Sequence, residues 1–186
     1  MKIEKAIAFA ANAHDGTKRK GKNRPYILHP LEVMLIIADY TDDEDVIAAA
    51  VLHDTVEDTG VTAEDIRREF GERVSELVAA ESENKRRGES SENTWQIRKS
   101  ETIDHIKAAP RDAKLICLGD KLANLREIAR DYVKEGDALW KRFNQKEKGM
   151  HGWYYGSLYE ILKAEFGDIP AILEYGRLLE QVFGSV

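Results

Sequence analysis

The chain has 186 residues, of which 42% are apolar, 33% are charged and only 8% are aromatic. This length and composition fit one globular domain and argue against intrinsic disorder. The net charge of −6 excludes the overall positive field that is expected of a protein that binds duplex nucleic acid. An anionic ligand would therefore have to be held by a local group of cations.

The start of the chain and its cysteine content bear on the compartment. Cys117 is the single cysteine, which excludes an intramolecular disulfide and a cysteine-rich zinc site. The first residues contain the acidic Glu4 and an apolar run that Asn12 interrupts, which is unlike a signal peptide. No stretch approaches the about 18 apolar residues that a membrane span needs. We expect a cytoplasmic protein that binds neither nucleic acid nor a membrane.

Apolar residues recur at spacings of three and four along almost the whole chain, and alternating β-branched runs are missing. This pattern predicts an all-α fold, a single-domain helical bundle over residues 1–186. Polar segments predict loops at 15–24 and at 81–93, the second of which we interpret as a mobile loop or a substrate lid. Helices are expected over 3–13, 30–40, 62–70, 72–80, 94–108, 111–136, 137–166 with a break near 149, and 169–183. A further helix, which Asp42 and Asp43 can cap and Gly60 ends, has 46–58 as its most apolar part.

The helix expected to end near residue 58 carries acidic residues along its apolar face. His53, Asp54, Glu57 and Asp58 fall within six residues, and Asp54 and Asp58 repel each other at a spacing of four. A buried carboxylate without a partner costs several kcal/mol, and no Lys or Arg lies between residues 25 and 66. A metal ion could neutralise these acids. The plainer interpretation is that they form the solvated end of an ordinary helix.

Two other places favour the metal. Asp120 lies among apolar residues of a later helix, and His29 lies among apolar residues just before Pro30, which we expect to hold it extended at a helix start. Alone, His29 would more often be a core histidine. Together, His29, His53, Asp54 and Asp120 supply two imidazoles and two carboxylates, a set that suits Mn²⁺, Fe²⁺, Zn²⁺ or Co²⁺ better than Ca²⁺.

Four segments carry a resemblance to a known family. They are Lys-Arg-Lys-Gly at 18–21, Pro-Tyr-Ile-Leu-His-Pro at 25–30, Leu-His-Asp-Thr-Val-Glu-Asp-Thr at 52–59 and Leu-Gly-Asp-Lys-Leu-Ala-Asn-Leu-Arg at 118–126. The order of a histidine, a His-Asp pair and a distant aspartate is similar to the HD-domain phosphohydrolases. The segments resemble, more narrowly, the hydrolase domain of the RelA/SpoT alarmone enzymes and their small stand-alone relatives. The resemblance covers about residues 5–130, followed by the expected C-terminal helices at 137–183.

The resemblance implies a metal site and a catalytic pair. A divalent ion, usually manganese in that family, would be held by His29, His53, Asp54 and Asp120. Iron, cobalt, zinc and magnesium stay open as alternatives. Glu57 and Asp58 would assist the attacking water, a role that fits their place one turn beyond Asp54.

The resemblance also implies a small-molecule nucleotide substrate. Arg19 and Lys20 would hold the base or the phosphates, and Asn124 would contact the nucleotide. The implied reaction removes the 3′-pyrophosphate from guanosine 3′,5′-bis(diphosphate). The chain length leaves no room for the synthetase domain of the long enzymes, so we expect degradation only.

Departures from the family pattern keep two alternatives open. Gly119 replaces the usual alanine, which we expect to be harmless, whereas an extra residue between Lys20 and Pro25 reshapes the basic loop. A phosphohydrolase for another nucleotide phosphate, including a cofactor 2′-phosphate, is therefore one alternative. The other is a non-catalytic regulator that binds metal and nucleotide, against which the repelling Glu57 and Asp58 argue.

Several remaining residues are given structural roles. Aromatic residues at helical spacing are more often core residues than base-stacking platforms, which applies to Trp140, Trp153 and Tyr155. The cysteine is expected to be a small buried apolar residue. Histidines without a ligand-type neighbour at metal-binding spacing are interpreted as structural, namely His14, His105 and His151.

Overall fold

The computed structural model describes residues 1–82, 86, 88, 90 and 92–184. Over these residues the chain is helical without any strand, apart from an isolated bridge between Lys18 and Pro25. The predicted all-α fold is confirmed. No helix in the described part of the chain is both long and apolar enough to cross a lipid bilayer. Six of the thirteen residues of the loop predicted over 81–93 lie outside the described residues, so its interpretation as a lid stays a prediction.

The chain divides into two compact units, which we describe separately. The first contains Met1–Ser82 and Pro110–Asp120, and the second contains 83–109 and Lys121–Val186. The prediction of a single domain over the whole chain stays a prediction. The helices of the first unit are α1 (Lys2–Ala13), α2 (Leu28–Ala38), α3 (Glu44–Leu52), α4 (Thr55–Asp58), α5 (Ala63–Phe70), α6 (Glu72–Glu81) and the beginning of α8 (Arg111–Glu135).

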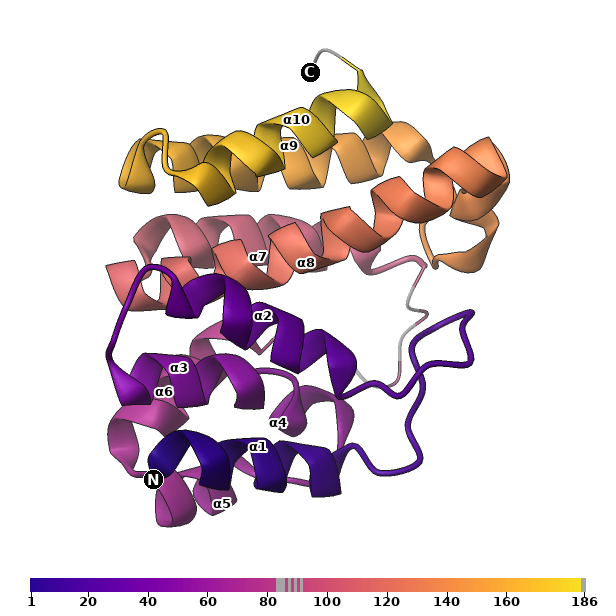
Figure 1. The fold of residues 1–186 in the computed structure, drawn as a ribbon. Coiled ribbons are helices and arrows are strands. Elements are labelled where there is room, and N and C mark those ends of the chain that lie inside the picture. The colour runs from indigo at the N-terminus through magenta and orange to yellow at the C-terminus, as the bar shows by residue number, and fades with distance from the viewer. Residues whose placement is uncertain (83–85, 87, 89, 91, 185–186) are drawn as a thin grey trace. The chain divides into compact units, whose positions relative to one another are not determined.

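Helix α3 is the centre of the first unit. Every residue from Val46 to Leu52 is buried, as expected of a helix that is apolar all round. It packs against α1, α2 and α6, and Figure 1 shows it between α1 and α2. The predicted aspartate cap is confirmed, because the Asp43 side chain accepts a hydrogen bond from the Asp45 backbone N–H at 2.9 Å. Burial of α3 gives the residues that follow it a rigid base.

The prediction of one continuous helix over 46–58 is wrong, because the helix is interrupted at residues 53 and 54. Helix α3 ends at Leu52, and α4 begins at Thr55. The hydroxyl of Thr55 donates to the Leu52 carbonyl at 2.7 Å, and Nδ1 of His53 hydrogen-bonds the Ala50 carbonyl at 2.8 Å. Side chains that donate hydrogen bonds to backbone carbonyls in this way compete with the regular hydrogen bonds of a helix. The interruption places His53 and Asp54 in a turn between two helices.

Two other predicted boundaries differ from the structure. Helix α2 begins at Leu28, so His29 lies in its first turn and is not extended. Pro30 is tolerated there because the first N–H groups of a helix need no helical acceptor. In the second unit, the expected break near Gly149 instead lies between residues 142 and 148, because Gly149 belongs to the first turn of α9 (Lys148–Phe166). A glycine without positive φ does not by itself end a helix.

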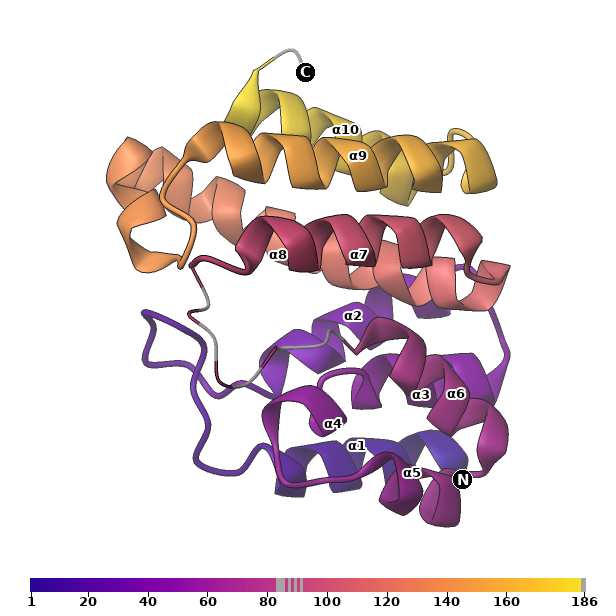
Figure 2. The same ribbon diagram turned by 180° about the vertical axis from the view of Figure 1, so that it is seen from behind.

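The second unit is built from long helices. They are α7 (Trp95–Ala108), the rest of α8, the 3₁₀ helix η1 (Gly136–Arg142), α9 and α10 (Pro170–Phe183). Helix α9 packs against α7 and α10, and Figure 2 shows it between them. Trp140 and Tyr155 are buried in an aromatic core that includes His151, whose ring stacks on Trp140 at 5.0 Å. The core interpretation of these residues is confirmed, whereas Trp153 is 36% exposed.

Candidate metal centre

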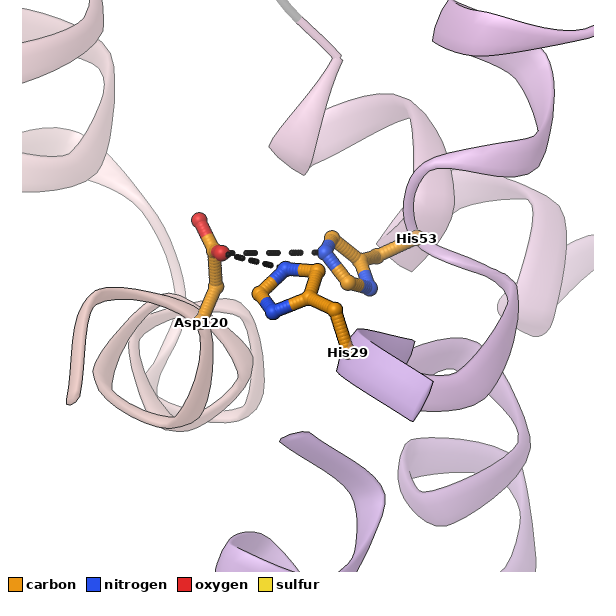
Figure 3. A group of neighbouring side chains, drawn as sticks. All are labelled: His29, His53 and Asp120. Carbon is orange, nitrogen blue, oxygen red and sulfur yellow. Dashed lines mark ion pairs between the residues drawn. The ribbon is translucent and has the colours of Figure 1, made fainter. Parts of the chain in front are cut away.

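Three separate elements of the first unit bring together two imidazoles and two carboxylates. His29 comes from the first turn of α2, His53 and Asp54 come from the turn after α3, and Asp120 comes from α8. One ligand-type atom from each of His29, His53 and Asp120 lies within 4.8 Å of the others. Figure 3 shows the Asp120 carboxylate facing both histidine rings. Residues more than sixty positions apart therefore form one buried cluster.

The distances within the cluster are short. Nε2 of His29 lies 3.1 Å from Oδ1 of Asp120 and 3.6 Å from Oδ2 of Asp54. Nε2 of His53 lies 3.1 Å from Oδ2 of Asp54 and 3.8 Å from Oδ1 of Asp120. Both imidazoles thus direct the same ring nitrogen at the same two carboxylates. One ion could contact all four side chains from this position.

The orientation of His53 is fixed from behind. Because its Nδ1 hydrogen-bonds the Ala50 carbonyl, its Nε2 is the atom that faces the carboxylates. Nε2 is buried and makes no hydrogen bond of acceptable geometry among the described residues, although Asp54 lies close to it. Metal-binding histidines typically donate one ring N–H to a backbone carbonyl or carboxylate and leave the other nitrogen for the ion. His53 has this arrangement, since its Nδ1 bonds the Ala50 carbonyl and its Nε2 faces the acidic cluster.

The protonation of the cluster fits the same interpretation. Burial alone would lower the pKa of His53, but the charges of Asp54 and Asp120 raise it to about 10. Burial alone would raise the pKa of Asp54, but the charge of His53 holds it well below its usual range. A proton on His53 therefore balances the carboxylates in the metal-free protein. A divalent cation can replace that proton, so the donor set of two nitrogens and two oxygens fits such an ion.

Tyr26 adds a hydrogen-bond donor beside this cluster. Its hydroxyl donates to Oδ2 of Asp54 at 2.7 Å and lies 3.0 Å from Oδ2 of Asp58. Burial, together with these two carboxylates, raises the pKa of the Tyr26 phenol far above its usual value, so the phenol stays a donor. The tilted ring of His14 lies 4.7 Å from the ring of Tyr26.

The contacts of Tyr26 and of His14 were not predicted from the sequence. Tyr26 stands three residues before His29, and the His29 N–H donates to the Tyr26 carbonyl at 2.9 Å. That spacing could have placed Tyr26 beside His29, but it gives no signal for the contacts with Asp54 and Asp58. His14 is buried, and both of its ring nitrogens lack a hydrogen-bond partner in the described structure. No sequence signal pointed to its place against Tyr26.

Of the predicted catalytic pair, Asp58 is linked to the cluster through the Tyr26 hydroxyl. Glu57 and Asp58 belong to α4, the short helix that begins directly after Asp54. Asp58 shares the Tyr26 hydroxyl with Asp54, and Glu57 is partly buried. The plainer interpretation of a fully solvated helix end does not hold for Asp54, whose side chain is 18% exposed. The catalytic roles of Glu57 and Asp58 stay predictions.

The predicted nucleotide-binding residues have different positions. Arg19 and Lys20 lie in the loop between α1 and α2, where the Arg19 N–H donates to the Arg24 carbonyl at 3.0 Å. The Arg19 guanidinium lies 5.4 Å from the centre of the Tyr26 ring, which places it at the edge of the cluster. Asn124 belongs to the part of α8 in the second unit. The roles of all three residues in substrate binding stay predictions.

Comparison with known proteins gives consistent matches. A family model described as HD domain matches residues 6–150. A guanosine-3′,5′-bis(diphosphate) 3′-pyrophosphohydrolase of Aquifex aeolicus is 39% identical over 128 residues, which are 68% of this chain and 18% of that protein. A protein of the same activity name from Xenopus tropicalis, MESH1, is 38% identical over 131 residues, which are 69% of this chain and 70% of that protein.

Two solved structures are also similar. A metazoan ortholog of SpoT, described as hydrolysing ppGpp, aligns with a TM-score of 0.75 and 26% identity over 99% of this chain and 97% of that chain. A protein of Listeria monocytogenes EGD-e aligns with a TM-score of 0.72 and 31% identity over 90% of this chain and all of that chain. These similarities extend over both units, whereas the match to the Aquifex protein spans a small part of its length.

Proposed function

The chain belongs to the HD domain family, and from this we propose that it is a metal-dependent phosphohydrolase that removes the 3′-pyrophosphate of guanosine 3′,5′-bis(diphosphate). The observation that carries the proposal is the buried convergence of His29, His53, Asp54 and Asp120, with Asp58 beside it. Relatives that span most of this chain and bear that activity name support the substrate.

The ion would be held by the two Nε2 atoms and by carboxylate oxygens of Asp54 and Asp120. Manganese is the first candidate, and Fe²⁺, Co²⁺, Zn²⁺ and Mg²⁺ are the alternatives for this mixed donor set. When bound, such an ion lowers the pKa of water and withdraws charge from phosphoryl oxygens. Metal analysis of protein purified without chelator tests the identity of the ion.

Other residues of the chain would accept the proton and bind the nucleotide. Glu57 and Asp58 would accept the proton of the attacking water, since they lie one turn beyond Asp54. The water oxygen bonds to the phosphorus at the ribose 3′ oxygen, the bond from that phosphorus to the 3′ oxygen breaks, and the 3′ oxygen gains a proton. Arg19 and Lys20 would bind the anionic nucleotide, a task for which a local basic loop is needed in a chain of net charge −6. The products are the guanosine 5′-diphosphate and pyrophosphate.

The test is incubation of the protein with Mn²⁺ and guanosine 3′,5′-bis(diphosphate), with both products measured by ion-exchange chromatography. We expect stoichiometric release of pyrophosphate, which the Asp54→Ala variant should abolish. Asp39→Ala is the matched control, because Asp39 is an exposed aspartate at the end of α2. If the nucleotide stays intact in the presence of protein that has bound Mn²⁺, the proposed substrate is wrong.

The extra residue in the loop between Lys20 and Pro25 favours one second candidate, a phosphohydrolase for another nucleotide phosphate. A phosphate-release screen over nucleoside 2′-, 3′- and 5′-phosphates distinguishes it from the first. A regulator that binds metal and nucleotide without turnover is less well supported, because it would have no need for two repelling acids beside the ion. Tight nucleotide binding without product, unaffected by Glu57→Gln, would favour the regulator.

A further inference from the structure

The hydroxyl of Tyr26 has one proton and two carboxylate neighbours. Its oxygen lies 2.7 Å from Oδ2 of Asp54 and 3.0 Å from Oδ2 of Asp58. The two aspartates lie one helical turn apart, where like charges repel. A donor shared between them lowers that repulsion and holds both carboxylates at defined positions. The two acids are therefore coupled through a residue from a different segment of the chain.

The oxygen of Asp54 that receives this hydrogen bond is the oxygen that faces the histidines. Oδ2 of Asp54 lies 3.1 Å from Nε2 of His53 and 3.6 Å from Nε2 of His29. Rotation of the Asp54 carboxylate away from the histidines would break the contact with Tyr26. The Tyr26 hydroxyl thus selects the carboxylate orientation that a metal ion requires.

Tyr26 itself is held firmly. Its backbone N–H donates to the Thr17 carbonyl at 2.9 Å, and its carbonyl accepts from the His29 N–H at 2.9 Å. The ring packs against buried His14 at 4.7 Å, and the Arg19 guanidinium lies 5.4 Å from its centre. A phenol fixed by the backbone and by neighbouring side chains can orient the groups to which it donates.

We propose that Tyr26 is a positioning residue that fixes the ligand oxygen of Asp54 and holds Asp58 beside it through one shared hydroxyl. Its effect on metal binding depends only on the cluster of the first unit. Its effect on turnover rests on the proposed function, in which Asp58 assists the attacking water.

The first test is Mn²⁺ binding to Tyr26→Phe, measured by electron paramagnetic resonance titration. Loss of a residue that orients a ligand costs about 10-fold to 100-fold in metal affinity or activity, so we expect the Kd for Mn²⁺ to rise by about tenfold. Tyr132→Phe is the matched control, because it also removes a tyrosine hydroxyl bonded to an aspartate, Asp137, that we place in no site. An unchanged Mn²⁺ affinity in Tyr26→Phe would overturn the proposal.

The second test separates positioning from a general loss of structure. We expect Tyr26→Phe to lower kcat by about tenfold or more while KM changes less than about twofold, since the hydroxyl is bonded to the acids and not to the substrate. At saturating Mn²⁺ in an Asp58→Asn background, the same substitution should lower kcat less, because the hydrogen bond to Asp58 is already altered and only the one to Asp54 remains to be lost. Equal effects of Tyr26→Phe in both backgrounds would contradict the coupling.

A third variant keeps the proposal testable if Tyr26→Phe folds poorly by circular dichroism. Asp58→Asn retains Tyr26, so Asp54 should stay oriented and the Kd for Mn²⁺ should change less than about threefold. A loss of Mn²⁺ binding in Asp58→Asn would overturn the proposed division of roles. If the wild-type protein binds Mn²⁺ but leaves the guanosine nucleotide intact, the proposed substrate fails while the affinity measurements still decide the role of Tyr26.

Discussion

Gly119, the residue before Asp120, offers a test of how closely α8 must approach α2 in the first unit. A Cβ atom at this position would lie 2.7 Å from Cγ2 of Ile37, 3.1 Å from Cγ1 of Val33 and 3.2 Å from the Val33 carbonyl oxygen. Carbon atoms in ordinary contact are about 3.5–4.0 Å apart. The substitution Gly119→Ala would therefore require about 1 Å more separation between the new Cβ and Cγ2 of Ile37, through movement of the Ile37 side chain or of the two helices. The sequence predicted that glycine is harmless here, and the structure adds that Ile37 occupies the space of the missing methyl group.

Two opposing effects determine the stability of Gly119→Ala. Alanine in a helix interior is favoured over glycine by about 1 kcal/mol. Overpacking a closed core costs about 1–3 kcal/mol. Relief by side-chain movement is restricted, because Ile37 is fully buried and β-branched and the third contact is backbone. We expect overpacking to outweigh propensity, with a net loss of about 1 kcal/mol in the free energy of unfolding.

The same displacement should weaken metal binding. Asp120 directly follows Gly119, and its Oδ1 lies 3.1 Å from Nε2 of His29 in α2. Any movement of α8 away from α2 that relieves the overlap would therefore change the geometry of these two ligands. Urea unfolding without metal measures the first effect, and Mn²⁺ titration measures the second, for which we expect about a tenfold rise in Kd. Gly149→Ala is the control, because nothing lies within 4 Å of that Cβ position in α9 and the variant should be as stable as wild type or more so. A Gly119→Ala protein with wild-type stability and wild-type Mn²⁺ affinity would refute this reasoning.

Further predictions concern the metal ligands and the packing of the second unit. Asp54→Ala should lose Mn²⁺, whereas Glu57→Gln should retain it and lower kcat by about 100-fold, as measured by metal titration and steady-state kinetics. The pKa of His53 is raised from 6.5 to about 10, so its proton stabilises the metal-free fold below pH about 6.5, and that stabilisation is lost as the pH rises through about 10. Because Mn²⁺ must displace this proton, Mn²⁺ affinity should increase by about tenfold per pH unit between pH 7 and 9, and a flat calorimetric profile would contradict this. Arg126→Ala, which breaks a two-pronged ion pair with Glu174 at 2.7 Å, should cost about 1 kcal/mol in urea unfolding.

Much of the fold could be predicted because helical periodicity and caps are local signals. The helix predicted over 62–70 is α5, which begins with a capping box between Thr62 and Asp65. The interruption after α3 could not be predicted in the same way, because the hydrogen bonds of His53 and Thr55 to backbone carbonyls compete with a helix that the apolar pattern favours. Helix α2 likewise begins before Pro30, since a first turn accepts proline at more than one position.

The residues of the candidate metal site could be predicted from the sequence, but many of their contacts could not. Buried acids without nearby cations indicated a missing charge, and Asp54 and Asp120 do face the two histidines. The role of Tyr26 could not be inferred, because its hydroxyl reaches Asp54 and Asp58 only through tertiary folding that joins the loop before α2 to α4. No pattern in the sequence encodes such a reach across 28 residues.

The backbone contact of His53 also determines which of its ring nitrogens is available to an ion. Since Nδ1 is committed to the Ala50 carbonyl, an arriving cation and a solvent proton compete for one nitrogen of this ring. Loading is then an exchange at a single atom, without a ring flip or a change of tautomer. Acid would favour release of the ion by returning that proton, while the hydrogen bond to Ala50 would keep the imidazole facing Asp54.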